Sequence, residues 1–99
     1  MILTVLEATV APERASELRA AFQSAAAAGL PPGFVRSLLI SSANDATHWR
    51  IETLWASREV LAAMRQAGTP AGVLMFRAAG AEPTLSVYDV AASIEAASA

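Results

Sequence analysis

His48-Trp49-Arg50-Ile51-Glu52-Thr53-Leu54-Trp55-Ala56-Ser57-Arg58-Glu59 is the stretch that decides the fold of this chain. Its first eight residues are typical of a strand, and the spacing of Trp49 and Trp55 places both rings on one face of it. Ser57 is a good N-cap for a helix that follows directly. A strand that passes into a helix within two residues predicts a sheet with a helix packed close to the strand end.

The residues on either side of this junction predict further elements. The chain breakers are Pro12, the Leu30-Pro31-Pro32-Gly33 run, Gly68, Gly80 and Pro83. Between them the apolar patterns predict strands over 2–10, 34–42, 47–55 and 84–90, and helices over 12–29, 57–67 and 70–79. In the first helix Ala15, Leu18, Phe22 and Ala25 recur at spacings of three and four, which predicts its buried face.

This order of elements is β-α-β-β-α-β, with a short extra helix before the last strand. It predicts an α+β, ferredoxin-like fold with a four-stranded antiparallel sheet and helices on one face. We expect residues 1–91 to form a single domain and residues 92–99 to form a frayed C-terminal tail.

Composition indicates that the chain does not act as a single subunit. It has 99 residues, of which 55% are apolar and 16% charged. A chain of this length buries only about 60–65% of its unfolded surface. The open sheet face and the surplus of apolar residues therefore predict a homodimer in which two sheets pack face to face, rather than a poorly soluble monomer.

Several absences narrow the class of function. The chain has no Cys, all seven of its basic residues are Arg, and its net charge is −2. A disulfide, a thiolate nucleophile and a Lys Schiff base are therefore excluded, and nucleic acid is not an expected partner. The apolar run at residues 1–6 is too short for a signal peptide or a membrane span, so we expect a cytoplasmic protein without a membrane partner.

The chain resembles the antibiotic biosynthesis monooxygenase family over about residues 1–91. The segments that carry the resemblance are residues 51–59, the helix after them, Thr69-Pro70 with Phe76 beyond, and Pro83 followed by Val87-Tyr88-Asp89-Val90. The resemblance implies a dimeric α+β barrel. Some members of the family oxidise polyketide quinone precursors without metal or flavin, and others degrade haem.

A strand-pairing argument predicts where a ligand would bind. With a two-residue turn at Asn44-Asp45, one sheet face would carry Phe34, Arg36, Leu38 and Ile40 together with Trp49, Ile51, Thr53 and Trp55. This face is the more apolar, so we assign it to the helix side. The expected small-molecule pocket is walled by Trp49 and Trp55 and floored by Phe22, Met64 and Phe76. The alternative is that both Trp rings are core residues.

The candidate catalytic residues are Trp55, Arg36, Tyr88 and His48. Cofactor-free oxygenation requires an aromatic slot and a group that accepts a proton or stabilises an anion, and Arg36 or Tyr88 could supply the latter. His48 carries the only imidazole of the chain, the kind of group best suited to shuttle a proton, but it is predicted on the opposite face, where a hydrogen bond at the surface or the dimer rim is the simpler role.

No metal and no cofactor are expected. His48 and Glu52 would lie about 13 Å apart along a strand and could not share one ion. In family members that degrade haem, a His on the helix after the third strand binds the iron, and residues 61–65 of this chain contain none.

The sequence therefore predicts a cofactor-independent monooxygenase that oxidises a flat aromatic or quinol-type molecule. The alternative is a non-catalytic dimeric barrel that binds a small hydrophobic ligand or a protein partner.

Overall fold

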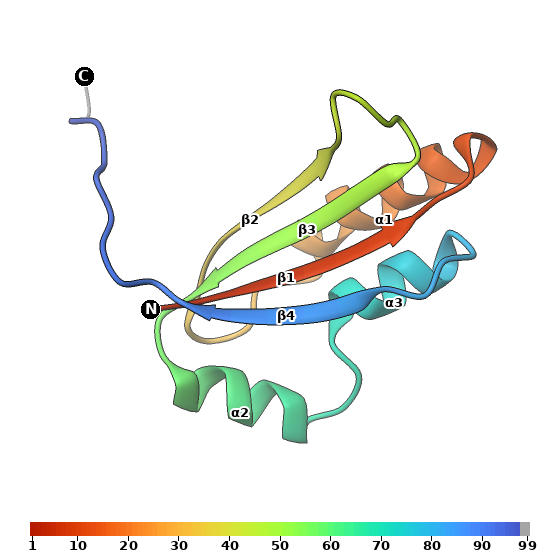
Figure 1. Cartoon of the computed structure of the whole chain (residues 1–99). Helices are drawn as coiled ribbons and strands as arrows, with labels where there is room; N and C mark the ends of the chain where they lie inside the picture. Colours follow the sequence, from red (N-terminus) through yellow and green to blue (C-terminus); the bar gives the residue numbers. More distant parts are fainter. Residues whose placement is uncertain (98–99) are drawn as a thin grey trace.

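The computed structural model describes residues 1–97 and contains one four-stranded antiparallel sheet with its helices on one side (Figure 1). The strands lie in the order β2-β3-β1-β4. In chain order the elements are β1 (Ile2–Thr9), the 3-10 turn η1 (Pro12–Arg14), α1 (Ala15–Ala27), β2 (Phe34–Ser41), β3 (His48–Trp55), α2 (Arg58–Gln66), α3 (Ala71–Ala78) and β4 (Thr84–Asp89). The predicted ferredoxin-like fold is confirmed.

The ends of the elements follow from local chemistry. The Ser57 hydroxyl accepts a hydrogen bond from the Val60 amide at 3.3 Å and so caps α2, as predicted. Pro12 begins the 3-10 turn that leads into α1, where its missing N–H costs nothing. Gly33 has a φ of 78° and turns the chain into β2, a conformation that a residue with a side chain rarely adopts.

The hairpin between β2 and β3 differs from its prediction. The connection spans residues 42–47 rather than two residues, and a bulge lies between Phe34 and Arg36. In the resulting register Arg36 lies opposite Leu54, Leu38 opposite Glu52 and Ile40 opposite Arg50. Because neighbouring residues point to opposite faces, Leu38 and Ile40 belong to the face away from the Trp rings, so their predicted placement was wrong. Arg36 adjoins the bulge, where the alternation is interrupted.

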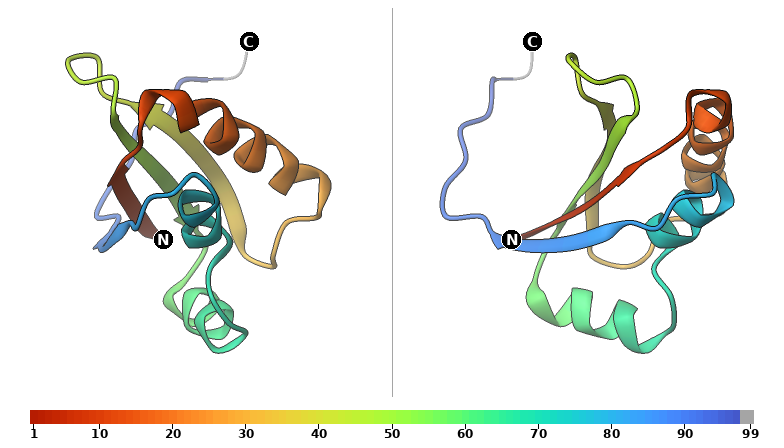
Figure 2. Two further views of the ribbon diagram at one scale, coloured as in Figure 1. Left: turned by 90° about the vertical axis from the view of Figure 1, so that its right-hand side faces the viewer. Right: turned by 45° about the vertical axis from the view of Figure 1, so that its right-hand side comes forward.

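The assignment of the Trp face to the helix side is confirmed. Trp49 and Trp55 are each 5% exposed and belong to two separate groups of buried side chains. Trp49 packs in the larger group, around Leu18 and Phe76 from α1 and α3. Trp55 packs with Ile2 and Leu61 in the smaller group, near α2. Figure 2 shows the helices gathered on one side of the twisted sheet, with α2 set apart from α1 and α3.

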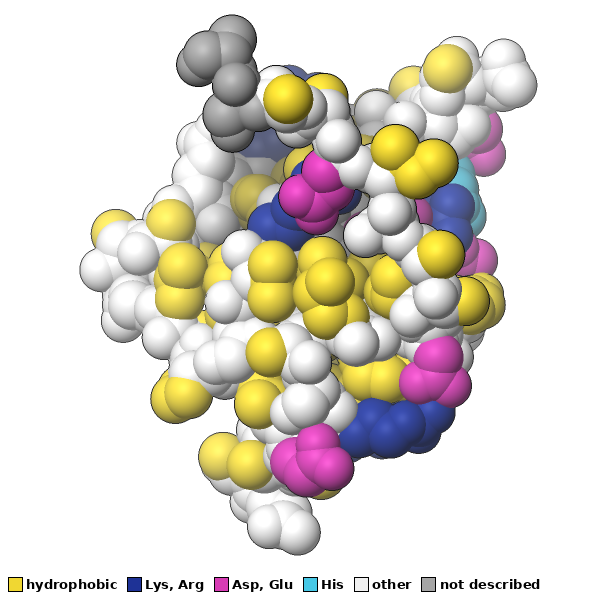
Figure 3. Space-filling model, turned by 90° about the vertical axis from the view of Figure 1, so that its left-hand side faces the viewer, with side chains coloured by type: hydrophobic (Ala, Val, Ile, Leu, Met, Phe, Trp, Pro, Cys, Tyr) yellow, Lys and Arg dark blue, Asp and Glu magenta, His cyan; other side chains and the backbone are white. Residues whose placement is uncertain are grey.

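The other side of the sheet carries no helix within the described residues (Figure 2). Among its side chains Leu38 is 46% exposed and Tyr88 is 52% exposed. Seen from the side of the N-terminus, a central band of hydrophobic side chains is visible (Figure 3). The sheet face that was expected to be open is therefore uncovered within residues 1–97 of the single chain. No helix within residues 1–97 is long and apolar enough to span a membrane.

Beyond β4 the chain extends away from the sheet (Figure 1). Residues 90–97 form neither helix nor strand, and the last two residues of the predicted tail, 98–99, lie outside the described residues.

Candidate functional site

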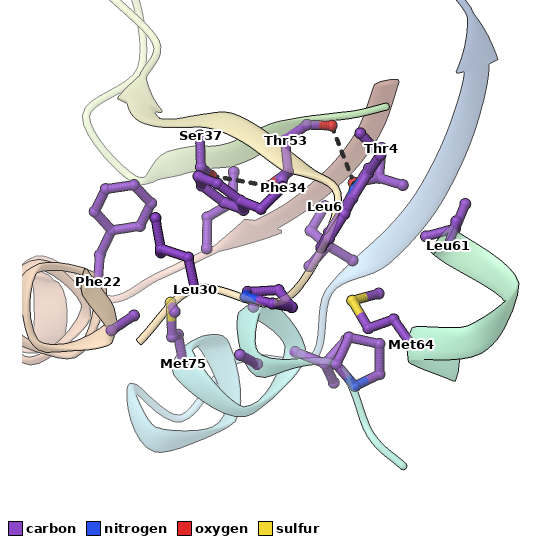
Figure 4. Close-up of a pocket in the computed structure, with 18 of the residues that line it drawn as sticks. Thr4, Leu6, Phe22, Leu30, Phe34, Ser37, Thr53, Leu61, Met64 and Met75 are labelled. Atoms are coloured by element: carbon purple, nitrogen blue, oxygen red, sulfur yellow. Dashed lines mark hydrogen bonds between the residues drawn. The ribbon is translucent and has the colours of Figure 1, made fainter. Parts of the chain in front are cut away.

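A cavity of about 550 Å³ lies between the helix side of the sheet and the three helices. β1, β2 and β3 form one wall, α1, α2 and α3 form the other, and residues 28–31 border it where the chain leaves α1 (Figure 4). Most of its lining is apolar, and its larger side chains include Phe22, Leu30, Phe34, Trp55, Met64 and Met75. Its size and lining are typical of a small-molecule site.

A short row of hydroxyl groups crosses the sheet wall of this cavity. The Trp55 indole N–H donates to the Thr4 hydroxyl at 3.0 Å, and that hydroxyl donates to the Thr53 carbonyl oxygen at 3.4 Å. The Ser37 and Thr53 hydroxyl groups lie 2.8 Å apart and share a hydrogen bond (Figure 4). The Trp55 indole is therefore fixed in place, and it offers a ligand its ring rather than its N–H group.

The Trp55 ring is also held by an aromatic neighbour. The Phe34 ring meets it edge-on, with centroids 5.9 Å apart and an angle of 87° between the planes. Both residues line the cavity, and both lie at the end of the hairpin where the bulge begins. The paired rings form a rigid aromatic wall against which a flat molecule could lie.

The charged groups of the cavity are of one sign. Arg36, where the bulge interrupts the alternation of β2, and Arg65, on α2, both line it. Among the described residues, no Asp, Glu or His lines the cavity. The site can therefore stabilise an anion, but its walls offer no carboxylate or imidazole to accept a proton.

The structure brings together some of the predicted site residues and separates others. Trp55, Arg36, Phe22 and Met64 line the cavity. Phe76 is fully buried in the core beside Trp49 and is absent from the cavity wall, because the side of α3 that carries it packs against α1 and the sheet.

Trp49 borders a second, smaller cavity of about 480 Å³. Its wall is formed by residues of α1, β2 and β3: Arg19, Phe22, Gln23, Ser37, Leu38, Leu39, Ser41 and Trp49. The two predicted Trp walls thus belong to different cavities.

His48 and Tyr88 lie on the uncovered face of the sheet. There the Glu7 carboxylate lies 3.8 Å from His48 Nε2 and 3.3 Å from Arg50 Nε, and Arg50 Nη2 lies 3.6 Å from Glu52. Arg50 therefore bridges Glu7 and Glu52 within one subunit. This charged cluster and Tyr88 are separated from the cavity by the thickness of the sheet.

The clear carboxyl pKa shifts occur outside the cavity. Hydrogen bonds from Thr47 hold the pKa of Asp45 below its ordinary value, since Asp45 Oδ1 accepts from the Thr47 hydroxyl at 2.6 Å and from its amide at 3.0 Å. The Arg77 guanidinium likewise lowers the pKa of Glu82 by hydrogen bonding to its carboxylate. These groups stabilise the hairpin loop and the turn after α3.

Sequence reasoning missed the hydroxyl row of Thr4, Ser37 and Thr53. The parity of β3 placed Thr53 on the Trp face, and Thr4 lies directly opposite it on β1. An inward Thr close to a Trp was the available signal. The predicted register put Arg36 and Leu38 on the Trp face and hence Ser37, which lies between them, on the other face; the bulge makes that assignment wrong.

The sequence profile of the antibiotic biosynthesis monooxygenase family matches residues 1–69. The chain belongs to this family. Among curated proteins, none matches the chain significantly.

Several solved structures share the fold. SnoaB, a cofactor-independent oxygenase from Streptomyces nogalater, is 19% identical with a TM-score of 0.69, and the match covers 94% of this chain and 95% of that one. A candidate antibiotic biosynthesis monooxygenase from Caulobacter crescentus CB15 is 24% identical with a TM-score of 0.70, covering 92% and 90%. A mutant of MhuD, with two manganese protoporphyrin IX molecules per active site, is 18% identical with a TM-score of 0.72, covering 97% and 100%. At these identities the likeness shows the fold alone.

The residues of this cavity do not fit a haem site of the kind that the resemblance implies. α2 contributes Leu61, Met64 and Arg65 to the wall and no His, and His48 lies across the sheet. A lone Met on an apolar helix face is ordinarily a packing residue.

Proposed function

We propose that this chain is a cofactor-independent monooxygenase that oxidises a flat aromatic or quinol-type molecule in the cavity beside Trp55. The observation that carries the proposal is the cavity itself. It is large enough for a small polycyclic ligand, is walled by the Trp55–Phe34 ring pair, and has positive but no negative side chains on its wall among the described residues.

Cofactor-free oxygenation requires few protein groups beyond such a cavity. A phenol or enol that loses a proton becomes electron-rich and can pass an electron to dioxygen. For an anthrone, carbon and oxygen then join to form a peroxide. Loss of water from this peroxide leaves one oxygen atom as a new carbonyl and releases the other with the two hydrogens of the original methylene group. A dry aromatic slot and an anion stabiliser favour these steps.

The residues of the wall have separate roles in this proposal. The Trp55 ring orients the substrate plane, and its N–H bond to Thr4 keeps the ring from turning. Arg36 stabilises the enolate, while water at the open side of the cavity takes the proton. Phe22 and Met64 exclude water from the reacting carbon.

We also propose that two copies pair through their uncovered sheet faces. Leu38 and Tyr88 would become buried there, and the cluster of His48, Glu7 and Arg50 would lie at the rim of the interface. A face-to-face dimer covers the surface that a single subunit leaves open.

The test is oxygen uptake with anthrone as substrate, compared with the buffer rate. The wild-type protein should exceed the buffer rate, and Trp55→Leu should reduce the excess at least tenfold because the wall is lost. Leu74→Ala is the matched control, since Leu74 lies on α3, is 53% exposed and does not line the cavity. Circular dichroism checks that each variant folds. Uptake equal to the buffer rate for the wild-type protein across anthrones and hydroquinones would refute the proposal.

A binding function without turnover is the second candidate. The observation in its favour is that no carboxylate or imidazole of the described residues lines the cavity, so an enzyme would lack a protein base. It predicts that a flat aromatic compound changes Trp fluorescence saturably and is recovered unaltered, with oxygen uptake at the buffer rate.

A further inference from the structure

The arginines of this chain fall into two groups. Arg14, Arg50, Arg58 and Arg77 form ion pairs with carboxylates, and none of them lines either cavity. The remaining three have no ion pair among the described residues, and all three line a cavity: Arg36 and Arg65 the larger, Arg19 the smaller. Since no carboxylate of the described residues lines either cavity, both favour a negatively charged ligand.

The smaller cavity is the more polar of the two and adjoins the larger one. Phe22 and Ser37 line both, so the cavities meet at these side chains. α1 supplies Arg19, Phe22 and Gln23 from one side of the helix, and β2 and β3 supply Ser41 and Trp49 opposite. A ligand of the main cavity whose flat part lies against Phe22 can therefore extend a polar group toward Arg19.

The indole N–H of Trp49, a residue of this second cavity, is a buried donor that costs free energy when no acceptor is bound. The Trp49 side chain is buried, with only 5% of the residue exposed, yet its indole Nε1 has no hydrogen-bond partner within residues 1–97. The other indole, that of Trp55, is paired with Thr4. Buried polar groups in proteins are nearly always hydrogen-bonded, so the orphaned N–H of a cavity-lining residue points to an acceptor that arrives from outside.

Arg19 lies beside this N–H group. Its guanidinium carbon is 5.3 Å from the centroid of the Trp49 ring, so the charged group stacks over the indole. Arg19 is exposed and its side chain is long, so it can move aside to admit a ligand group and still contact it. One cation and one N–H donor together match a carboxylate or a similar oxyanion.

We propose that Arg19 and Trp49 form an oxyanion subsite, and that the ligand of the main cavity is an amphipathic anion whose carboxylate occupies it. This inference deepens the proposed function by naming the substrate class, and it rests on the main cavity being the ligand site. The aromatic part lies against Phe22, which lines both cavities, and the carboxylate accepts a hydrogen bond from Trp49 Nε1 and pairs with the Arg19 guanidinium.

The experiment compares two probes that differ in charge, 2-naphthoate and 2-naphthamide, by calorimetric titration of the whole chain. The wild-type protein should bind the naphthoate more tightly. Arg19→Gln should weaken naphthoate binding about tenfold, equivalent to about 1.4 kcal/mol, and leave naphthamide binding unchanged. Arg58→Gln is the matched control, because Arg58 is an exposed arginine that lines neither cavity, and it should change neither affinity. Arg65→Gln removes a charge from the main cavity instead, and it should weaken naphthoate binding less than Arg19→Gln does.

A spectroscopic measurement gives an independent test of the hydrogen bond. The two indole N–H signals in the ¹H–¹⁵N spectrum are assigned with Trp49→Phe and Trp55→Phe. Naphthoate should move the Trp49 signal downfield as its N–H gains an acceptor. If a core variant fails to fold, Arg19→Gln still decides the question, since Arg19 is exposed.

Three results would overturn the proposal. Equal affinity for the two probes, with the Trp55 signal shifting, would remove the subsite but leave the main cavity as a ligand site. Loss of naphthoate binding in Arg65→Gln instead of Arg19→Gln would place the anion elsewhere. Failure of both probes to bind would remove the subsite and the proposed function together.

Discussion

Replacing Thr4 by Val tests the hydroxyl row that fixes Trp55. Val has nearly the same shape, so the change removes the hydroxyl without leaving a cavity. Thr4 is 7% exposed, and its hydroxyl accepts from Trp55 Nε1 at 3.0 Å. Without it the indole N–H stays buried and unpaired, which costs about 1–3 kcal/mol. For a chain of this size about 1 kcal/mol lowers Tm by roughly 4–8 °C, so Tm should fall by at least about 4 °C.

The assay is chemical and thermal unfolding at one fixed protein concentration, because subunit association would shift the apparent stability. Thr84→Val is the matched control, since Thr84 is an exposed strand residue whose hydroxyl lies 3.5 Å from the Glu7 carbonyl oxygen. It should change stability by less than about 0.5 kcal/mol. In the Trp55→Phe background, Thr4→Val should cost much less than alone. Equal losses for Thr4→Val and Thr84→Val would refute the reasoning.

Two further predictions concern the backbone and the pH dependence. Gly33→Ala should lower the free energy of unfolding in urea more than Gly29→Ala does. Both glycines have a positive φ, but a Cβ at Gly33 would overlap Val60, whereas Gly29 faces open space. Equal losses of unfolding free energy in the two variants would contradict this. Thr47→Val should raise the pKa of Asp45 toward its ordinary value. An NMR titration measures this change, and the pKa of Glu82 should stay the same in both proteins and serves as the reference. Because the folded state lowers the Asp45 pKa, the ionised carboxylate stabilises the fold above the ordinary carboxyl pKa, and this contribution is lost as pH falls through the lowered value. Thr47→Val should therefore reduce the dependence of stability on pH in the acid range. An Asp45 titration that does not move in this variant would contradict the assignment.

The elements of the fold could be predicted because local signals agree with the tertiary structure. Ser57 caps α2, the breakers around Gly33 and Gly68 separate the elements, and the inward stripe of α1 includes Leu18, which is fully buried. The parity of β3 placed both Trp rings on the helix side for the same reason, since alternation along a strand is a local property.

The register of β2 could not be predicted because it depends on a hairpin loop and a bulge. The Asx-type contacts of Asp45 with Thr47 hold a loop longer than the expected two-residue turn, and the bulge at Phe34 and Arg36 absorbs an extra residue. A shift of one residue exchanges the faces of a strand. Phe34 nevertheless kept its predicted face, because it precedes the bulge.

The most direct measurement is oxygen uptake with anthrone after the cavity has been filled. Ala25 and Ala27 both lie on α1, but Ala25 lines the cavity and Ala27 does not. If the reaction takes place beside Trp55, Ala25→Phe should abolish the excess uptake while Ala27→Phe retains it. Retained uptake in a folded Ala25→Phe variant would contradict the central claim that this cavity holds the substrate.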